Sequence, residues 1–172
     1  MSRDAPDTLS RSFRDAMGQL ASGVVMVTCH VDGRPWGLTV SACCSVSLEP
    51  PLLLVSLAER TVSAVAIGEH GRFGVSVLGE RGVEVARLGS APGQPKFVDG
   101  HVLDPGSPVR SATPVVAHAL AHVDCAVERR VPAGDHVIYL GRVLDVHRQP
   151  GDRPLVYYAR SYHGLGEAAP AP

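Results

Sequence analysis

The first apolar residues of the chain have the spacing of a helix. They recur every three or four positions: Leu9, Phe13, Met17 and Leu20. This period places them on one face of a helix, and Gly23 is expected to end that helix in a left-handed conformation. The pattern therefore predicts an amphipathic helix ahead of the rest of the fold.

After this segment the pattern becomes that of β-structure. Residues 24–31 are short, apolar and β-branched, and Asp32-Gly33 follows as a strong two-residue hairpin signal. Residues 35–47 are expected to return as the partner strand. Pro50-Pro51 then breaks the chain, and residues 52–57 are typical of a strand buried on both faces.

The rest of the chain continues with short elements. Residues 61–70 favour a helix that Thr61 caps and Gly71 ends. The remaining expected elements are a strand over residues 72–78, a short helix over 81–89, and strands over 114–131, 136–149 and 154–159. Residues 90–113 are rich in Gly, Pro and Ser, which predicts a long loop, and such loops are often functional.

Strands outnumber helices in this series, and the helix–strand alternation of a doubly wound fold is missing. A mainly β fold, an antiparallel barrel with a few peripheral helices, fits the order best. The 172 residues suit a single domain over residues 1–172, with a core of about residues 10–166.

Composition narrows the function classes. Hydrophobic residues make up 45% of the chain, the formal net charge is −1, and Lys96 is the only lysine. No basic stripe indicates nucleic acid or an anionic membrane, and no apolar run reaches membrane-spanning length. The four cysteines form no CxxC pair, so we expect reduced thiols in a cytoplasmic protein.

Standard catalytic and nucleotide-binding motifs are missing from the sequence. It contains no GxGxxG, no GxxxxGK[ST] and no GxSxG. His118, His122 and Cys125 have spacings that resemble metal ligands, but the valines around them favour a strand. Two strand positions four apart lie roughly 13 Å from each other, too far for one ion. We therefore expect no metal site.

The segment GLTVSACCSVS, residues 37–47, combines small hydroxyl and thiol side chains. On a strand, Thr39, Ser41 and Ser45 project to one side. Their small size lets a planar ligand approach the main chain, whose N–H and C=O groups then meet the ligand's donors and acceptors. A polar edge strand that faces solvent explains the same alternation.

Two further places hold candidate binding residues. His136 begins a strand after a tight turn, where a histidine can bind a substrate or carry a proton, although a surface histidine closing a hairpin has the same pattern. Lys96 can meet a phosphate or carboxylate, and Phe97 beside it can cover a ring face. A solvated lysine and a loop-anchoring phenylalanine are the alternative.

Taken together, these stretches resemble the flavin reductase-like family, the FMN-binding split barrels that act as reductase components of two-component flavin monooxygenases. The matching pieces, in the family's order, are FRDAMGQLASGVVMVT, GLTVS with SLEPP, RFGVSVL, KF, DC, GDHVIYLGRV and PLVYY. The resemblance covers about residues 13–165. The ordered set is more specific than any one motif.

The resemblance implies a homodimer of antiparallel split β-barrels of Greek-key type, each binding FMN or FAD near the subunit interface. NADH or NADPH would reduce the flavin by hydride transfer, and reduced flavin would leave for a separate flavin-dependent monooxygenase. The implied cofactor-binding residues are Thr39, Val40, Ser41, Ala42, Ser45, Ala58, Thr61, Ser63, Lys96, Phe97 and Tyr162. His136 matches the histidine of the family's GDH motif and is the implied catalytic residue, which orients the nicotinamide.

Some positions depart from the family pattern. Cys43-Cys44 replace bulkier or more polar residues, and Ala58 stands where Asp or Asn is frequent, which leaves the choice between FMN and FAD open. No adjacent basic cluster for a 2′-phosphate is present, which favours NADH. Two other functions remain: a flavin-binding electron carrier or related oxidase that holds FMN tightly, and a non-catalytic barrel that binds a small ligand or a protein.

Overall fold

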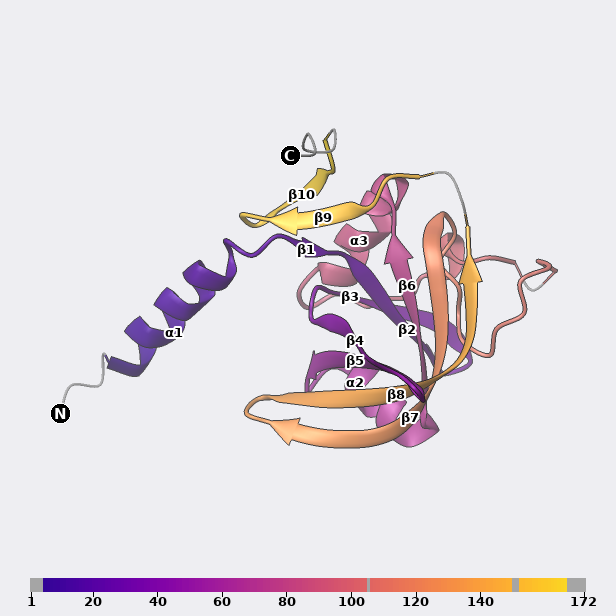
Figure 1. The fold of residues 1–172 in the computed structure, drawn as a ribbon, viewed down its shortest axis with the longest axis horizontal. Coiled ribbons are helices and arrows are strands. Elements are labelled where there is room, and N and C mark those ends of the chain that lie inside the picture. Colours follow the sequence, from indigo (N-terminus) through magenta and orange to yellow (C-terminus); the bar gives the residue numbers. More distant parts are fainter. Residues whose placement is uncertain (1–4, 105, 150–151, 167–172) are drawn as a thin grey trace.

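The computed structural model describes residues 5–104, 106–149 and 152–166. Its elements are α1 Ala5–Met17, β1 Ser22–Gly23, β2 Val25–Val31, β3 Arg34–Val40, β4 Cys43–Leu48, β5 Pro51–Ala58, α2 Val62–His70, β6 Arg72–Leu78, α3 Val83–Ser90, β7 Ala119–Ala133, β8 His136–Arg148, β9 Leu155–Tyr158 and β10 Ser161–Gly164, with short 3-10 turns at Glu80–Gly82 and Asp99–His101. Figure 1 shows α1 projecting from a body in which strands predominate.

Two antiparallel sheets make up this body. Seven strands follow the order β3-β2-β6-β7-β8-β5-β4, and three short ones follow the order β1-β9-β10. β7 and β8 pair along most of their length, with register shifts at Asp124/Cys125 and Val127/Arg129. Such shifts bend a strand, and both strands curve visibly in Figure 1. The mainly β, antiparallel fold with few helices is confirmed.

The segment expected as one strand over residues 35–47 is two strands. β3 ends at Val40, Ser41 and Ala42 form a corner, and β4 starts at Cys43. β3 pairs with β2 at one edge of the large sheet, whereas β4 pairs with β5 at the other. The single-strand prediction was wrong because alternation along a segment does not reveal where the chain changes its pairing partner. The corner also separates Thr39 on β3 from Ser45 on β4.

Local signals placed the first hairpin and α2 correctly. Asp32 and Gly33 have φ of 52° and 74°, the left-handed pair that a type I′ turn requires. Thr61 Oγ1 accepts a hydrogen bond from the N–H of Ala64 at 3.2 Å, and Gly71 ends α2 with φ of 67°. The predicted cap and terminating glycine therefore bound this helix.

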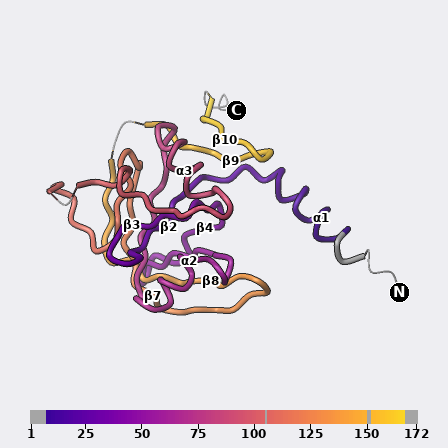
Figure 2. Tube along the Cα trace, turned by 180° about the vertical axis from the view of Figure 1, so that it is seen from behind, coloured from indigo at the N-terminus to yellow at the C-terminus, as the bar shows by residue number. Residues whose placement is uncertain are grey.

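The end of α1 was predicted wrongly. The helix stops at Met17, and Gly23 instead pairs with Val156 in the small sheet, a partner far away in the sequence. Figures 1 and 2 both show α1 extending away from the body. Its apolar face is exposed, with Leu9 at 73% and Phe13 at 66%. No helix in the described part of the chain is both long enough and apolar enough to span a membrane.

Two groups of buried side chains form the core. One packs α2 against the large sheet and includes Ile67, Phe73 and Tyr139. The other packs α3 near β2 and β3. β5, expected to be buried on both faces, is buried only at Val55 and Leu57 among its residues. Leu52, Leu54 and Ser56, which project to the other face of the strand, are only partly buried.

The long loop after α3 is confirmed. In the described parts of residues 91–118, Asp99–His101 is the one helical turn, and no strand longer than a single bridge is present. β7 begins at Ala119 rather than at residue 114 because His118, with φ of 60°, turns the chain out of the extended conformation.

The cysteines are free thiols in the structure. Burial raises the pKa of Cys29 and of Cys125 to about 12, and the pKa of Cys43 to about 11. These three side chains are therefore neutral at pH 7 and lack the thiolate form that reacts as a nucleophile. Cys29 and Cys125 serve as small apolar core residues.

Candidate functional site

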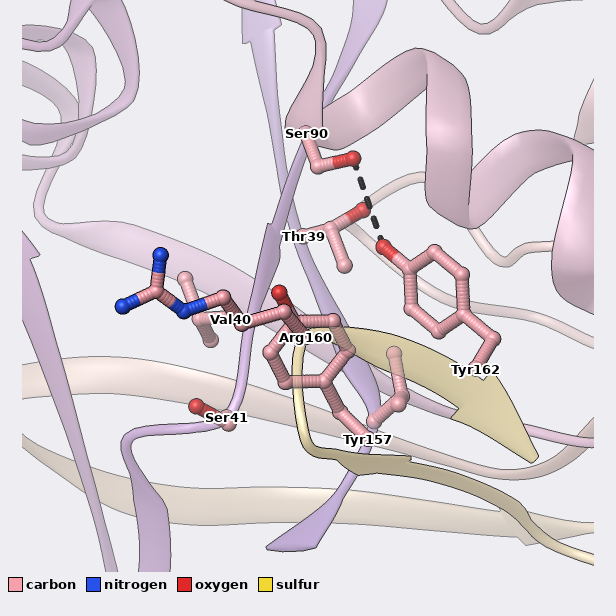
Figure 3. Close-up of a pocket in the computed structure, with 8 residues that line it drawn as sticks. Thr39, Val40, Ser41, Ser90, Tyr157, Arg160 and Tyr162 are labelled. Carbon is pink, nitrogen blue, oxygen red and sulfur yellow. Dashed lines mark hydrogen bonds between the residues drawn. The ribbon is translucent and has the colours of Figure 1, made fainter. Parts of the chain in front are cut away.

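A cavity of about 310 Å³ lies where β3 ends. We call it the hydroxyl pocket, and it is lined by Val24, Thr39, Val40, Ser41, Ser90, Tyr157, Arg160 and Tyr162. In Figure 3, Tyr157 and Tyr162 come from the C-terminal hairpin, opposite the end of β3 that carries Thr39 to Ser41. Aromatic walls with a few convergent polar groups are typical of sites for small molecules.

The β9–β10 hairpin brings the two tyrosines together. Tyr157 and Tyr162 are cross-strand partners whose ring centroids lie 5.3 Å apart. Between them, Ala159 and Arg160 have φ of 47° and 63°, which makes the tight turn of the hairpin. The hairpin thus holds an aromatic pair and one arginine over the end of β3.

α3 closes the hydroxyl pocket from another side. Thr39 Oγ1 donates to the carbonyl oxygen of Ala86 at 2.8 Å, and the Tyr162 hydroxyl donates to the same oxygen at 3.3 Å. A side chain at Gly89 would overlap Thr39 Oγ1, so the close approach of α3 and β3 requires glycine there. These contacts fix the walls of the pocket.

A larger cavity of about 620 Å³ lies at the start of α2. We call it the helix-terminus pocket, and it is lined by Val31, Asp32, Trp36, Leu38, Arg60, Thr61, Val62, Ser63, Gly93, Gln94, Pro95, Lys96 and Phe97. Arg60, Lys96 and the free N–H groups of the helix favour an anion there.

Ser63 carries the clearest sign of a ligand in this pocket. Ser63 is fully buried. In the described part of the chain, its hydroxyl is the one buried side-chain oxygen or nitrogen without a hydrogen-bond partner. Leaving a buried hydroxyl unpaired costs about 1–3 kcal/mol unless a ligand or water completes it. A phosphate at the start of α2 fits this donor set.

The linings of the two pockets include residues that are close together in the chain. Leu38 lines the helix-terminus pocket and the next residue, Thr39, lines the hydroxyl pocket. Ser90 and Gly93, three positions apart in the chain, are divided in the same way.

The predicted binding residues fall into three groups. Those in the hydroxyl pocket are Thr39, Val40, Ser41 and Tyr162. Those in the helix-terminus pocket are Thr61, Ser63, Lys96 and Phe97. Those that line neither pocket are Ala42, Ser45, Ala58 and His136. Ala42 lies in the corner itself, and Ser45 lies beyond it on β4, at the opposite edge of the sheet.

Lys96 and Phe97 also anchor the long loop. The Lys96 ammonium donates to the carbonyl oxygen of Ala91. The Phe97 ring packs edge-on against Trp36 with centroids 4.9 Å apart, and the Arg34 guanidinium lies 3.9 Å from its centre. Phe97 therefore anchors the loop, as the alternative interpretation of the sequence predicted. Both Lys96 and Phe97 also line the helix-terminus pocket.

His136 lies beside the approach to α2 rather than at the hydroxyl pocket. It pairs with Ala58 at the end of β5, and the Ala58 carbonyl accepts hydrogen bonds from Thr61. His136 Nδ1 lies 2.7 Å from Asp135 Oδ1, which holds the pKa of that carboxyl below its usual value. The imidazole is 44% exposed and so remains open to a ligand.

Sequence reasoning missed Arg60, Ser90, Tyr157 and Arg160. The segment YYARSY, residues 157–162, contains a signal for Tyr157 and Arg160. A tight turn centred on Ala159-Arg160 makes Tyr157 the cross-strand neighbour of Tyr162, which had been predicted as a binding residue. Ser90 reaches the hydroxyl pocket only through the packing of α3, and no local pattern reports that packing.

Comparison with known proteins agrees with this geometry. A family model described as the flavin reductase like domain matches residues 17–166. Actinorhodin polyketide dimerase of Streptomyces coelicolor is 42% identical over 160 residues, covering 92% of this chain and 88% of that protein. Flavin reductase (NADH) of Kitasatospora aureofaciens is 40% identical over 154 residues, covering 88% and 79%.

A solved structure gives the same result. BorF, the flavin reductase component of a bacterial two-component tryptophan halogenase, matches with a TM-score of 0.79 and 35% identity, covering 92% of this chain and 99% of that one. The family model over residues 17–166 and relatives of 40% identity or more define the class of protein. The chain belongs to the flavin reductase-like family, which confirms the family predicted from the ordered motifs.

Proposed function

We propose that this chain is an NADH:flavin oxidoreductase that binds FMN or FAD across the two pockets and releases reduced flavin to a separate flavin-dependent monooxygenase. The observation that carries the proposal is the unpaired Ser63 hydroxyl at the start of α2, in a cavity whose lining residues Leu38 and Gly93 are close in the chain to Thr39 and Ser90 of the hydroxyl pocket. The similar protein BorF is the reductase component of a two-component halogenase, and this likeness supports a separate acceptor of reduced flavin.

The residues of each pocket bind a different part of the flavin. Tyr157 and Tyr162 provide ring faces for the isoalloxazine, and the main chain of Thr39 to Ser41 provides donors and acceptors along its edge. Thr61, Ser63 and the N–H groups of α2 hold the phosphate. The flavin and the nicotinamide supply the hydride chemistry, so the protein's contribution is alignment and exclusion of water.

His136 binds the nicotinamide in this proposal. Its exposed imidazole and its position beside the approach to α2 leave it free to contact a second ligand. We expect His136→Ala to raise the KM for NADH about tenfold while changing the flavin KM less than twofold, as for loss of one hydrogen bond to a ligand. Steady-state kinetics at varied NADH and flavin measures this, and an equal loss for both ligands rejects the role.

We further propose that the large sheet is a split barrel. Its two edge strands, β3 and β4, are joined by Ser41 and Ala42 alone, so the opposite edges of a seven-stranded sheet come close together. The bent strands β7 and β8 support the same curvature. The neutral, unpaired thiols support a cytoplasmic location.

The apolar face of α1 supports a homodimer. Leu9 and Phe13 are more than half exposed on a helix that leaves the body of its own chain. A second copy would cover this face. Phe13→Glu is expected to convert a dimer into a monomer in sedimentation or light scattering, whereas Ser12→Glu, outside the apolar face, adds the same charge as a matched control. A dimer unaffected by Phe13→Glu contradicts this use of α1.

The central experiment is NADH oxidation with FMN, FAD and riboflavin supplied in turn. Turnover that depends on added free flavin is the expected result. A yellow protein that keeps its flavin through gel filtration and barely oxidises NADH with added flavin instead identifies an electron carrier or oxidase. No turnover and no flavin binding would identify a non-catalytic barrel and end the proposal.

A further inference from the structure

Arg160 is the one charged side chain among the described residues that line the hydroxyl pocket. The turn that carries it is held in place, because the N–H of Ala159 donates to the carbonyl oxygen of Gly18 at 3.1 Å. Figure 3 shows the arginine side chain extended past Val40, with its guanidinium on the side away from Tyr162 and Ser90. A cation is therefore presented at the edge of a pocket whose other lining groups are neutral.

Two of the neutral hydroxyls of the pocket, those of Thr39 and Tyr162, already have partners in the protein. Thr39 Oγ1 donates to the carbonyl oxygen of Ala86. The Tyr162 hydroxyl contacts that oxygen and also Ser90 Oγ, both at 3.3 Å. Among the side chains that line the pocket, Arg160 is the one that carries a full positive charge to match a full negative charge on a ligand.

Arg160 is paired, but weakly. Its guanidinium lies 2.6 Å from Asp15 Oδ1 in the last part of α1, and the two side chains are 66% and 60% exposed. Exposed pairs of this kind contribute roughly 0–1 kcal/mol, since water screens both charges. An anion in the pocket can therefore replace Asp15 as the partner of the guanidinium.

We propose that Arg160 makes the pocket selective for reduced over oxidised flavin, an inference that rests on the flavin reductase function proposed above. In the reaction, the C4–H bond of NADH breaks and its hydrogen leaves with both electrons to form an N–H bond at flavin N5. NADH becomes NAD⁺, and one negative charge is left on the flavin, spread over its N1–C2=O end. No other proton moves in this step.

The guanidinium suits that charge in shape as well as sign. Its planar N–H fork can donate to adjacent nitrogen and oxygen atoms, and hydrogen bonds between ionised partners are about twice as strong as neutral ones. The oxidised ring is neutral and gains much less from the same contact. Because the arginine interacts more strongly with the product, it favours electron uptake by the bound flavin.

The test measures binding in both oxidation states. Riboflavin is titrated into the full-length protein under anaerobic conditions, once oxidised and once reduced with dithionite. Arg160→Gln is expected to weaken reduced riboflavin about tenfold and oxidised riboflavin less than twofold. A tenfold difference corresponds to a fall of about 30 mV in the two-electron potential of the bound flavin. Arg160→Lys, which keeps the charge, is expected to recover part of the selectivity.

Two variants serve as matched controls. Arg153→Gln removes an equally exposed arginine that pairs with Glu80, outside both pockets, and reports any general charge effect. Asp15→Asn releases Arg160 and keeps its charge, so it is expected to bind reduced riboflavin at least as tightly as the wild type. Thermal melting of each variant confirms that it is folded.

Five results would overturn the proposal. Equal weakening in both oxidation states by Arg160→Gln indicates a wall residue. An effect seen with FMN but not with riboflavin assigns the arginine to the phosphate. A loss in Asp15→Asn as large as in Arg160→Gln assigns it to holding α1. If the wild type turns over flavin and Arg160→Gln has the same preference between reduced and oxidised riboflavin as the wild type, this inference alone is wrong. If the wild type neither binds nor reduces flavin, the proposed function is wrong as well.

Discussion

Two polar clusters on the large sheet differ in how their groups are satisfied. The first, the buried histidine cluster, consists of Ser76, Thr113, His122 and Asp124, and the second is the hydroxyl pocket. His122 is 1% exposed, with Nδ1 2.9 Å from Ser76 Oγ and Nε2 3.0 Å from Thr113 Oγ1. Thr113 Oγ1 also donates to Asp124 Oδ1 at 3.2 Å.

The buried cluster fastens the end of the long loop to β6 and β7. The N–H of Val116 donates to Ser76 Oγ at 3.2 Å, and the N–H of Ala112 donates to Asp124 Oδ2 at 3.1 Å. No room is left for a side chain at Gly74, whose Cβ would lie 2.5 Å from His122 Cε1. The hydroxyl pocket, in contrast, keeps a cavity and an exposed arginine. Polar groups that are buried and paired stabilise the fold, while those beside a cavity remain available to a ligand.

The largest expected effect is at the centre of the buried cluster. His122→Ala leaves a cavity and removes partners from Ser76 and Thr113, so we expect the free energy of unfolding to fall by about 4 kcal/mol. Urea denaturation measures this loss. Ser111→Ala, which removes only a peripheral contact to His122, should cost less than about 1 kcal/mol. A fall near zero for His122→Ala would show that the cluster does not hold the loop.

Lowering the pH is expected to reduce the free energy of unfolding slightly less than His122→Ala does. Burial lowers the pKa of His122 from 6.5 to about 4, an effect opposed by Asp124 and Asp145 and reinforced by His147. Above pH 6.5 the histidine is neutral whether the chain is folded or unfolded. Below pH 6.5 the unfolded chain binds a proton that the folded one does not, so stability falls until about pH 4 and the contribution is then constant.

This pH dependence amounts to a loss of up to about 3 kcal/mol between pH 6.5 and pH 4. Urea denaturation at several pH values measures it. In His122→Gln, which is of similar size and does not titrate, the slope between these pH values should be much smaller. An unchanged slope in that variant would assign the acid sensitivity to other groups.

Ser63 tests the same comparison between paired and available polar groups, because its hydroxyl is buried like those of the histidine cluster but has no hydrogen-bond partner. Ser63→Ala is expected to leave the unfolding free energy unchanged or to raise it by up to about 1 kcal/mol, since the wild-type hydroxyl has no bond to lose. The Kd for FMN should rise about fivefold, and that for riboflavin should not change, as only FMN carries the phosphate. Flavin fluorescence titration measures both, with Ser47→Ala as a control away from the pockets. Equal shifts for the two flavins would place the phosphate elsewhere.

The smallest effect is expected in the wall of the hydroxyl pocket. Tyr162→Phe removes two long hydrogen bonds of 3.3 Å but keeps the ring, so the unfolding free energy should change by less than about 0.5 kcal/mol. Flavin affinity should fall about twofold. Thermal melting and fluorescence titration measure the two quantities, and a loss of stability above 1 kcal/mol would make the tyrosine part of the structural core.

Local signals predicted the elements well and the site in part. The Asp32-Gly33 turn, the Thr61 cap and the Gly71 stop are set by neighbouring residues, so the sequence reports them directly. Thr39 was found by the pattern of small hydroxyl residues on its strand and by the family resemblance, and Ser63 by the resemblance alone; they line the two pockets. The His118, His122 and Cys125 spacing did not reveal the structural role of His122, whose partners lie on β6 and in the loop.

The sequence by itself determined the helices, most strands, the long loop and the family, because caps, turns and alternation act over a few residues. Only the tertiary structure decided that residues 35–47 split between opposite edges of the sheet and that α3 and the C-terminal hairpin meet over Thr39. It also decided the position of Arg160, a residue without a motif. Pairings between distant segments depend on the packing of the whole chain, and local patterns carry no record of the partner.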